Sequence, residues 1–298
     1  MKKTYVILGG TGHTGKPIAQ GLLAAGHNVR IVGRDKSKAA DLIAQGAEFL
    51  QGDQQDAGFL TKAFTGADAV YAMVPPNMQA EDFPSYQRKG ADAIATAIQD
   101  AKVPNVVMLS SVGAHRPDGV GAIGGLHYME QKFNAIEGLN ARYLRAGYFM
   151  ENLLGFTGMV KHMGILGSAM NPDQRFSTVA TKDVAARGLK RLLDLDFKGK
   201  DHEFVLGPSE HSYSEMTIVL GKHIGKNDLK YVQFPVADAA QGMMGMGMSK
   251  SVADNMNGIA EGMITGRITE GLQRTPENTG KTTFEEFAGT WKAVYDMN

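Results

Sequence analysis

The segment Tyr5-Val6-Ile7-Leu8-Gly9-Gly10-Thr11-Gly12-His13-Thr14-Gly15-Lys16 is a short apolar run that leads into three evenly spaced glycines. Glycine lets the backbone turn tightly and lets a phosphate approach backbone N–H groups with no Cβ in the way. A helix that begins near Thr14 would direct the positive end of its dipole at that phosphate. The segment therefore predicts a strand, a dinucleotide-binding turn and a helix, with the phosphate contacts made by Gly9, Thr11, Gly12, His13, Thr14 and Gly15.

Short apolar runs and helical patterns alternate through the first half of the chain. Strands are expected at 29–32, 47–50, 68–74, 106–109 and 142–146, and helices at 39–45, 59–64, 85–101 and 126–137. The glycine-rich, polar stretch 112–125 is expected to be a loop. Near-continuous apolar strands separated by helices are typical of parallel strands that are covered on both faces. Residues 1–150 therefore predict an α/β domain with a doubly wound parallel sheet.

The alternation loosens in residues 151–298. Helices are expected at 150–162, 181–194, 213–224 and 283–296, and short strands near 203–206 and 229–233. We expect a smaller α/β lobe for the substrate, packed over the carboxyl edge of the sheet, where open α/β folds bind their ligands. The methionine-rich segment 241–248 suits either an adaptable lid over an apolar substrate or a surface helix end with no such role, and we favour the second.

Composition excludes several classes of protein. The 298 residues hold 31 Lys and Arg against 31 Asp and Glu, and this zero net charge argues against binding to nucleic acid or to an anionic membrane. The absence of cysteine excludes disulfides and thiolate chemistry, and the eight histidines lack the spacing of a metal site. No apolar run is long enough for a signal peptide or a membrane span. We expect a soluble, cytoplasmic protein.

Basic residues follow the second expected strand. Arg34 stands where an acidic residue would bind the ribose hydroxyls of NAD, and a guanidinium there suits the 2′-phosphate of NADP(H). Lys36 and Lys38 could add positive charge, whereas Asp35 weakens the interpretation. The alternative is a solvated basic helix start. We expect NADP(H) to be preferred over NAD(H).

Other candidate contacts follow the later strands. Asp53-Gln54 could line the adenine slot or simply form a turn before a helix whose cap is an aspartate. Val74-Pro75 should lie beside the nicotinamide ribose, and Ser110-Ser111 at the substrate end of the cofactor, because the carboxyl ends of parallel strands meet at one crevice.

Together these motifs resemble the NmrA-like family, atypical members of the short-chain dehydrogenase/reductase superfamily. The resemblance rests on the glycine turn, on Gly33-Arg34, Gly52-Asp53 and Ser110-Ser111-Val112-Gly113, and on the segments 144–154 and 176–185, and it covers about residues 3–235. It implies a Rossmann-like domain, a small C-terminal substrate lobe and NADP(H) binding. It also implies that segments near 176–185 and 203–206 return to the main sheet.

The catalytic residues stay open between two sets. Tyr128 and Lys132 satisfy Y-x-x-x-K, the pair with which ordinary short-chain dehydrogenases protonate a carbonyl. The family resemblance, however, places its cofactor-touching residue about eighteen positions before the arginine of the next strand, and counting back from Arg145 leads to His127. We favour His127 as the contact with ribose or substrate over the Tyr128/Lys132 pair.

Tyr148, Phe149 and Asn152 follow the sixth expected strand and should wall the nicotinamide end of the crevice, although they could equally pack between lobes. The leading hypothesis is an NADP(H)-dependent oxidoreductase that acts on a quinone-like or other small conjugated acceptor. The alternative is a non-catalytic NADP(H)-binding redox sensor with a regulatory protein partner. A third hypothesis is an enzyme resembling isoflavone reductases or epimerases. The resemblance leaves a homo-oligomer open.

Overall fold

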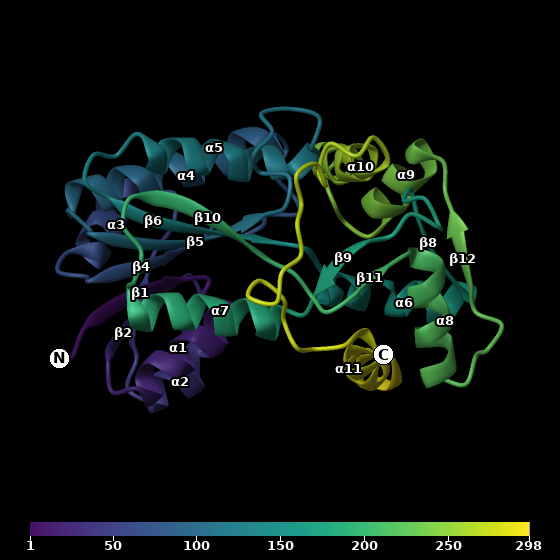
Figure 1. The fold of residues 1–298 in the computed structure, drawn as a ribbon, viewed down its shortest axis with the longest axis horizontal. Coiled ribbons are helices and arrows are strands. Elements are labelled where there is room, and N and C mark those ends of the chain that lie inside the picture. The colour runs from purple at the N-terminus through teal and green to yellow at the C-terminus, as the bar shows by residue number, and fades with distance from the viewer. Residues whose placement is uncertain (298) are drawn as a thin grey trace.

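The structure is a computed structural model that describes residues 1–297, and a seven-stranded parallel sheet organises its N-terminal lobe (Figure 1). The spatial order of the strands is β10-β6-β5-β4-β1-β2-β3, and every pairing between neighbours is parallel. The strands are β1 Thr4–Leu8, β2 Asn28–Gly33, β3 Glu48–Gln51, β4 Ala69–Ala72, β5 Asn105–Ser111, β6 Asn140–Ala146 and β10 Lys200–Val205.

Helices cover both faces of this sheet (Figure 1). One face carries α3 Ala57–Phe64, α4 Phe83–Asp100 and α5 Gly124–Asn134, and the other carries α1 Gly15–Ala24, α2 Ala40–Ala44 with the preceding 3-10 turn Lys36–Ala39, and α7 Thr181–Asp194. Strand β1 shows why both layers are needed. Successive side chains of a strand point to opposite faces, so Val6 and Leu8 join the core under one layer while Tyr5 and Ile7 join the core under the other.

Strand β1 lies between β2 and β4, so the chain builds the sheet outward in both directions from it. The segments that follow β1 and β4 therefore diverge and leave a crevice at the carboxyl edge, which is the usual ligand position in such sheets. Gly9, after β1, lies against the side chain of Met73, after β4. The glycine turn thus stands at the point where the strand order reverses.

The C-terminal lobe has two small sheets and its own core (Figure 1). Strands β7 Tyr148–Phe149, β9 Phe176–Val179 and β11 Glu210–His211 form one sheet, and β8 Ile165–Ser168 pairs with β12 Lys230–Gln233 in the other. The helices are α6 Thr157–Met163, α8 Tyr213–His223, α9 Val236–Gly245, α10 Lys250–Ile264 and α11 Phe284–Met297, with the 3-10 segment Met150–Phe156 before α6. Trp291 of α11 is fully buried in this core, and its Nε1 donates to the carbonyl oxygen of Leu153 at 2.8 Å.

The predicted fold class is confirmed, and so is the return of residues 203–206 to the main sheet, because β10 pairs with β6. The expectation that 176–185 as a whole returns to that sheet is wrong for its strand. The chain leaves the main sheet at Gly147, where a Cβ would lie 2.8 Å from the carbonyl oxygen of Ser177, and β9 pairs with the departing β7 instead. Helix α7 packs back on the main sheet, and Val179 at the end of β9 joins the same core. The division at residue 150 stays a prediction.

Three local expectations also differ from the structure. The expected loop 112–125 contains the 3-10 turn Gly121–Ile123 and the first residues of α5, and the first half of the expected helix 150–162 is 3-10 rather than α. Helices α9 and α10 were not expected, although α10 carries a readable apolar stripe, Val252, Met256, Ile259 and Met263.

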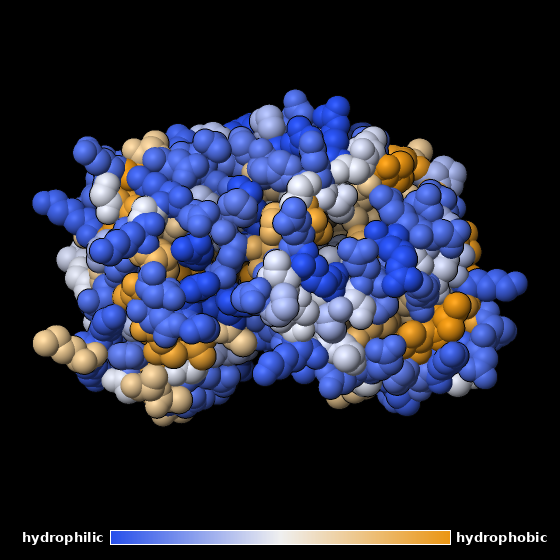
Figure 2. Space-filling view, viewed as in Figure 1, coloured by the Kyte–Doolittle hydropathy of each residue, from blue (hydrophilic) through white to orange (hydrophobic). Residues whose placement is uncertain are grey.

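Figure 2 shows a mostly hydrophilic face with hydrophobic side chains gathered over the region of α8 and α9.

The first prediction concerns the C-terminal core. Trp291→Ala should lower the free energy of unfolding by about 3–5 kcal/mol, because it leaves a large cavity and an unsatisfied carbonyl at Leu153. Chemical denaturation followed by circular dichroism measures the change. Ile218→Ala, at a side chain that is 53% exposed, is the matched control and should change stability by about 0.5 kcal/mol or less. Equal losses in the two variants would contradict the prediction.

Candidate functional site

The glycine turn brings the start of α1 against the end of β1. A Cβ at Gly15 would overlap the carbonyl oxygen of Gly9, and a Cβ at Gly10 would lie 2.7 Å from Ile31. Gly9 itself has a φ of 64°, a conformation that favours glycine. The N–H of Gly12 donates to the carbonyl of Gly9 at 2.9 Å and closes the turn. Glycine is therefore required here by close packing as well as by backbone conformation.

The turn leaves hydrogen-bond donors free. Within residues 1–297, the N–H groups of Thr11 and His13 donate to no backbone carbonyl, and Thr11, Gly12 and His13 are all exposed. Thr14 differs from its neighbours because its side chain is buried, and its Oγ1 accepts a hydrogen bond from the Tyr71 hydroxyl at 3.0 Å. The Thr14 side chain therefore anchors the turn to β4, and exposed backbone donors remain at the N-terminus of α1 for an anion.

Free cations lie beside the end of β2. Arg34 and Lys38 are exposed, and neither side chain has a hydrogen bond or ion pair with the described residues 1–297. Asp35 does not neutralise them through a direct contact, since its Oδ1 accepts hydrogen bonds from the N–H and Oγ of Ser37 at 2.9 and 2.6 Å. Those two bonds lower the pKa of Asp35. The geometry leaves Arg34 available to an external phosphate.

The structure gives Asp53 a local role. Its Oδ1 accepts from the N–H of Gln55 at 2.9 Å, and Asp56 caps α3 by accepting from the N–H of Phe59 at 3.0 Å. These bonds match the turn and cap that were the alternative to an adenine contact. Gln54 is different, because its Oε1 is buried and has no partner within residues 1–297. Gln54 therefore keeps an acceptor free at this edge.

A cavity of about 690 Å³ lies at the carboxyl edge of the main sheet and is lined by residues of both lobes; we call it the interlobe cavity. Seven residues predicted from the sequence line it: Val74, Pro75, Ser110, Ser111, Tyr148, Phe149 and Asn152. The structure thus brings together the predicted nicotinamide-end and substrate residues in one space. Met73, which touches Gly9, also lines the cavity and joins it to the glycine turn.

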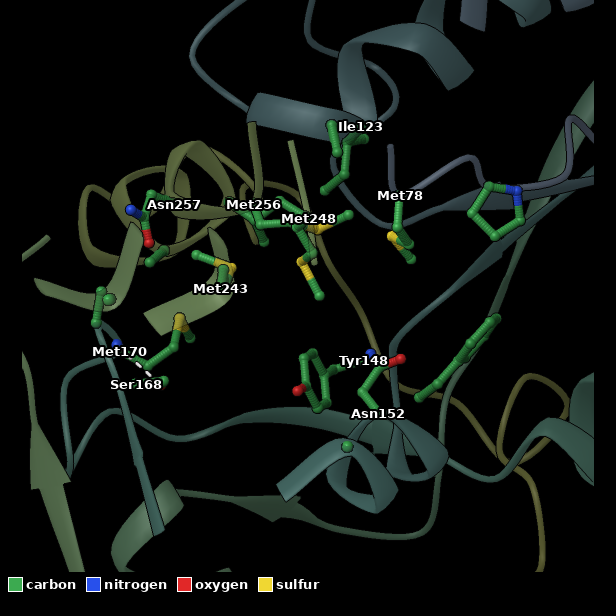
Figure 3. A pocket seen from close by; sticks show the side chains of 18 of the residues that line it. Met78, Ile123, Tyr148, Asn152, Ser168, Met170, Met243, Met248, Met256 and Asn257 are labelled. Atoms are coloured by element: carbon green, nitrogen blue, oxygen red, sulfur yellow. Dashed lines mark hydrogen bonds between the residues drawn. The ribbon is translucent and has the colours of Figure 1, made fainter. Parts of the chain in front are cut away.

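The wall of the interlobe cavity is apolar and rich in methionine. Figure 3 shows the side chains of Met78, Met248 and Met256 facing Tyr148 and Asn152 across the space. Eight of the 17 methionines of the chain line it, namely Met73, Met78, Met159, Met170, Met243, Met246, Met248 and Met256. Three of these come from the segment 241–248, so the lid interpretation of that segment has support that the favoured surface interpretation lacks. Flexible thioethers let such a wall adapt to its ligand.

Hydroxyl groups interrupt this apolar wall. The hydroxyls of Tyr148 and Tyr213 lie 2.8 Å apart, and Ser168 Oγ lies 2.7 Å from the hydroxyl of Tyr231. Burial raises the pKa of Tyr148 and of Tyr213, so both hydroxyls keep their protons at neutral pH. Tyrosine hydroxyls at the cavity wall are suited to orient a polar atom of an otherwise apolar ligand.

The predicted catalytic residues lie outside the cavity lining. Tyr128 and Lys132 both contact Asp92 of α4, the hydroxyl at 2.9 Å and the ammonium at 2.7 Å. His127 lies on a different side of α5, directly after the cavity residue Leu126, with Nδ1 2.9 Å from the carbonyl oxygen of Ala114. Because a carbonyl can only accept, Nδ1 carries the proton, and Nε2 of the neutral ring is left as an acceptor.

Sequence reasoning missed a buried ion pair beneath this site. Glu130 is 2% exposed, and it accepts hydrogen bonds from the Arg145 guanidinium at 3.0 and 2.6 Å and from Ser110 Oγ at 2.6 Å. These bonds tie α5 to the ends of β5 and β6. The only signal was a carboxylate beside the apolar stripe of the 126–137 helix, and nothing local indicated its partner.

The described residues 1–297 contain neither a metal-binding cluster nor a helix that could span a membrane. Within residues 1–297 no three His, Asp or Glu side chains are grouped so that they could hold a metal ion. Every helix in that range is too short or too polar to cross a lipid bilayer.

These features fit NADP(H). The glycine turn offers free N–H donors and a surface that a Cβ would obstruct, and Arg34 is an unpaired cation where the adenosine ribose would carry its phosphate. The crevice at the reversal of strand order leads through Met73 into the interlobe cavity. The residues present therefore match a phosphorylated dinucleotide at one end and an apolar ligand at the other.

Two curated relatives are similar over nearly the whole chain. An NAD(P)H azoreductase of Xenophilus azovorans is 28% identical over 292 residues, 97% of this chain and 98% of its own. A (4-alkanoyl-5-oxo-2,5-dihydrofuran-3-yl)methyl phosphate reductase of Streptomyces griseus is 26% identical over 93% of each chain.

Solved structures share the fold at lower identity. The NADPH complex of an NADPH-dependent quinone oxidoreductase from Escherichia coli superposes with a TM-score of 0.79 at 21% identity, over 96% of this chain and 99% of that one. The NADP(H) complex of a triphenylmethane reductase from Citrobacter sp. also gives 0.79, at 16% identity, over 97% and 99%. The profile of the NmrA-like family matches residues 1–288, and the chain therefore belongs to the NmrA-like family.

Proposed function

We propose that this protein is an NADP(H)-dependent oxidoreductase that transfers a hydride to a quinone-like or other small conjugated acceptor. The observation that carries the proposal is the interlobe cavity, a space of about 690 Å³ that is lined by apolar and aromatic side chains and meets the glycine turn at Met73. The NAD(P)H dependence of the similar azoreductase and the NADPH dependence of the structurally similar quinone oxidoreductase support it.

Different residues of the chain would bind different parts of the cofactor. The free N–H groups of the glycine turn would hold the pyrophosphate, and Arg34 with Lys38 would hold the 2′-phosphate. Val74, Pro75, Ser110 and Ser111 would line the nicotinamide end. When bound, the cofactor supplies the hydride.

The walls of the interlobe cavity then position the acceptor and exclude water. Tyr148, Phe149 and the methionines offer apolar surface to a flat ring system, and the Tyr148 hydroxyl donates a hydrogen bond to an acceptor oxygen. His127 is proposed to touch the cofactor ribose through Nε2 or, when Nε2 also carries a proton, to give that proton to the reduced acceptor. Tyr128 and Lys132 are proposed to be structural, because Asp92 binds both.

The proposal is tested by offering NADPH and a panel of quinones to the purified protein and following the loss of NADPH absorbance. Turnover that saturates with the quinone is expected. Tight NADPH binding without turnover, together with a cofactor-dependent change in oligomeric state, would contradict the enzyme and favour the non-catalytic sensor.

The second prediction concerns cofactor choice. Arg34→Ala should weaken NADPH binding by about tenfold to a hundredfold, since a charge-assisted contact with the 2′-phosphate is lost, and should leave NADH binding within about twofold. Calorimetric titration of both cofactors measures the effect. Lys198→Ala, another exposed cation without a partner in residues 1–297, is the control. Equal NADPH and NADH affinities in the unmodified protein would overturn the NADP(H) assignment.

The third prediction separates the two catalytic candidates. His127→Ala should lower kcat by about tenfold to a hundredfold, whereas Tyr128→Phe should leave kcat within about twofold, because its hydroxyl contacts Asp92 rather than the cavity. Steady-state rates with one quinone, after circular dichroism has shown both variants folded, provide the comparison. A dead Tyr128→Phe beside an active His127→Ala would reverse the assignment.

The fourth prediction concerns Tyr148. Tyr148→Phe keeps the ring that packs edge-on against Phe176 but removes the hydroxyl, so kcat/KM for a quinone should fall by up to about tenfold. Tyr295→Phe is the control, because Tyr295 stacks on Trp291 and does not line the cavity. An unchanged kcat/KM in Tyr148→Phe would show that the hydroxyl does not orient the acceptor.

A further inference from the structure

The wall of the interlobe cavity carries negative charge and no positive charge within residues 1–297. Among the lining residues within 1–297, Asp238 is the only one with a charged side chain, and no lysine or arginine lines the space. The rest of the wall is aliphatic, thioether, aromatic, hydroxyl or amide. This contrasts with the chain as a whole, in which 31 acidic and 31 basic residues balance.

The Asp238 carboxylate has no partner that would neutralise it. Asp238 lies in the first turn of α9, is exposed, and has no hydrogen bond or ion pair with the described residues 1–297. Lys250, the cation at the start of the following helix α10, is bound to Asp254 at 2.7 Å.

An unpaired charge beside an apolar space acts on the ligands that enter it. Low-dielectric walls focus the field of such a charge, so an anionic ligand is repelled and a cationic ligand is attracted before it touches the wall. The aromatic lining residues, among them Tyr148, Phe156 and Tyr213, add to the attraction, because the faces of their rings favour cations.

We propose that the interlobe cavity selects neutral and cationic aromatic acceptors against anionic ones, and that the unpaired carboxylate of Asp238 sets this selection. The inference rests on the proposed function, because it names the charge class of the acceptor that the same cavity takes. Asp238 is a specificity-determining residue in this view and takes no part in hydride or proton transfer.

The experiment compares three ligands of one ring system, namely naphthoquinone, its sulfonate and its trimethylammonium-methyl derivative. Each is measured with the full chain, with Asp238→Asn and with Asp238→Lys, both by NADPH turnover and by equilibrium dialysis. Comparing variants with the same ligand removes the differences in reduction potential among the three quinones. Asp228→Asn is the matched control, because it makes the same change in net charge at an exposed carboxylate that, like Asp238, has no hydrogen bond or ion pair within residues 1–297 and does not line the cavity.

In Asp238→Asn, kcat/KM should rise by about fivefold for the sulfonate and fall by about fivefold for the trimethylammonium compound, as expected for one charge near a protein surface. The neutral quinone should change by less than about twofold, and Asp238→Lys should reverse the ranking. The differences should shrink in about 1 M salt, where the screening length is about 3 Å. Asp228→Asn should behave as the unmodified protein.

Dialysis separates failure of this inference from failure of the proposed function. A charge ranking in dissociation constants that Asp238→Asn abolishes supports the inference even if no quinone is reduced. Turnover with the same charge ranking in the unmodified protein and in Asp238→Asn overturns the inference and leaves the oxidoreductase standing. A ranking that Asp228→Asn changes equally also overturns it, because net charge alone would then be responsible. Binding of none of the three ligands overturns it as well.

Discussion

The close approach of helix α1 to strand β1 is the constraint on which the rest of the structure depends. A Cβ at Gly15 would overlap the Gly9 carbonyl, so the helix can start at this distance only because residue 15 is glycine. The approach leaves the N–H groups of Thr11 and His13 free at a helix N-terminus. It also sets Gly9 against Met73, so that the anion-binding turn and the apolar cavity share a border.

A second close contact determines how the cavity closes. After β6, the chain passes the backbone of Ser177 at Gly147 and leaves the main sheet, so β7 and β9 build the second lobe beyond its carboxyl edge. The lobe returns α9 and α10, with their methionines, over the crevice. A predominantly apolar wall with few polar groups results, which suits a small ligand whose orientation is set by a few hydroxyls.

Much of the N-terminal lobe was predictable because its signals are local. The run at 106–109 is apolar over four consecutive residues, and the run at 29–32 is apolar apart from Arg30; the structure places both in the main sheet. The strand of 176–185 was assigned to the wrong sheet, since four apolar or hydroxyl residues do not reveal their partner. Helix α10 was missed although its apolar stripe is regular, because the neighbouring glycines and methionines weakened the pattern.

The sequence alone determined the turn, the alternation of strand and helix, the cation at Arg34 and the residues Val74, Ser110 and Tyr148 of the crevice, because each depends on neighbours within one or two elements. Only the tertiary structure decided that Asp92 binds Tyr128 and Lys132, that Glu130 pairs with Arg145, and that Asp238 is the only charged residue lining the cavity within 1–297. These facts depend on side chains far apart in the chain, whose approach is set by packing between helices, strands and lobes rather than by local sequence.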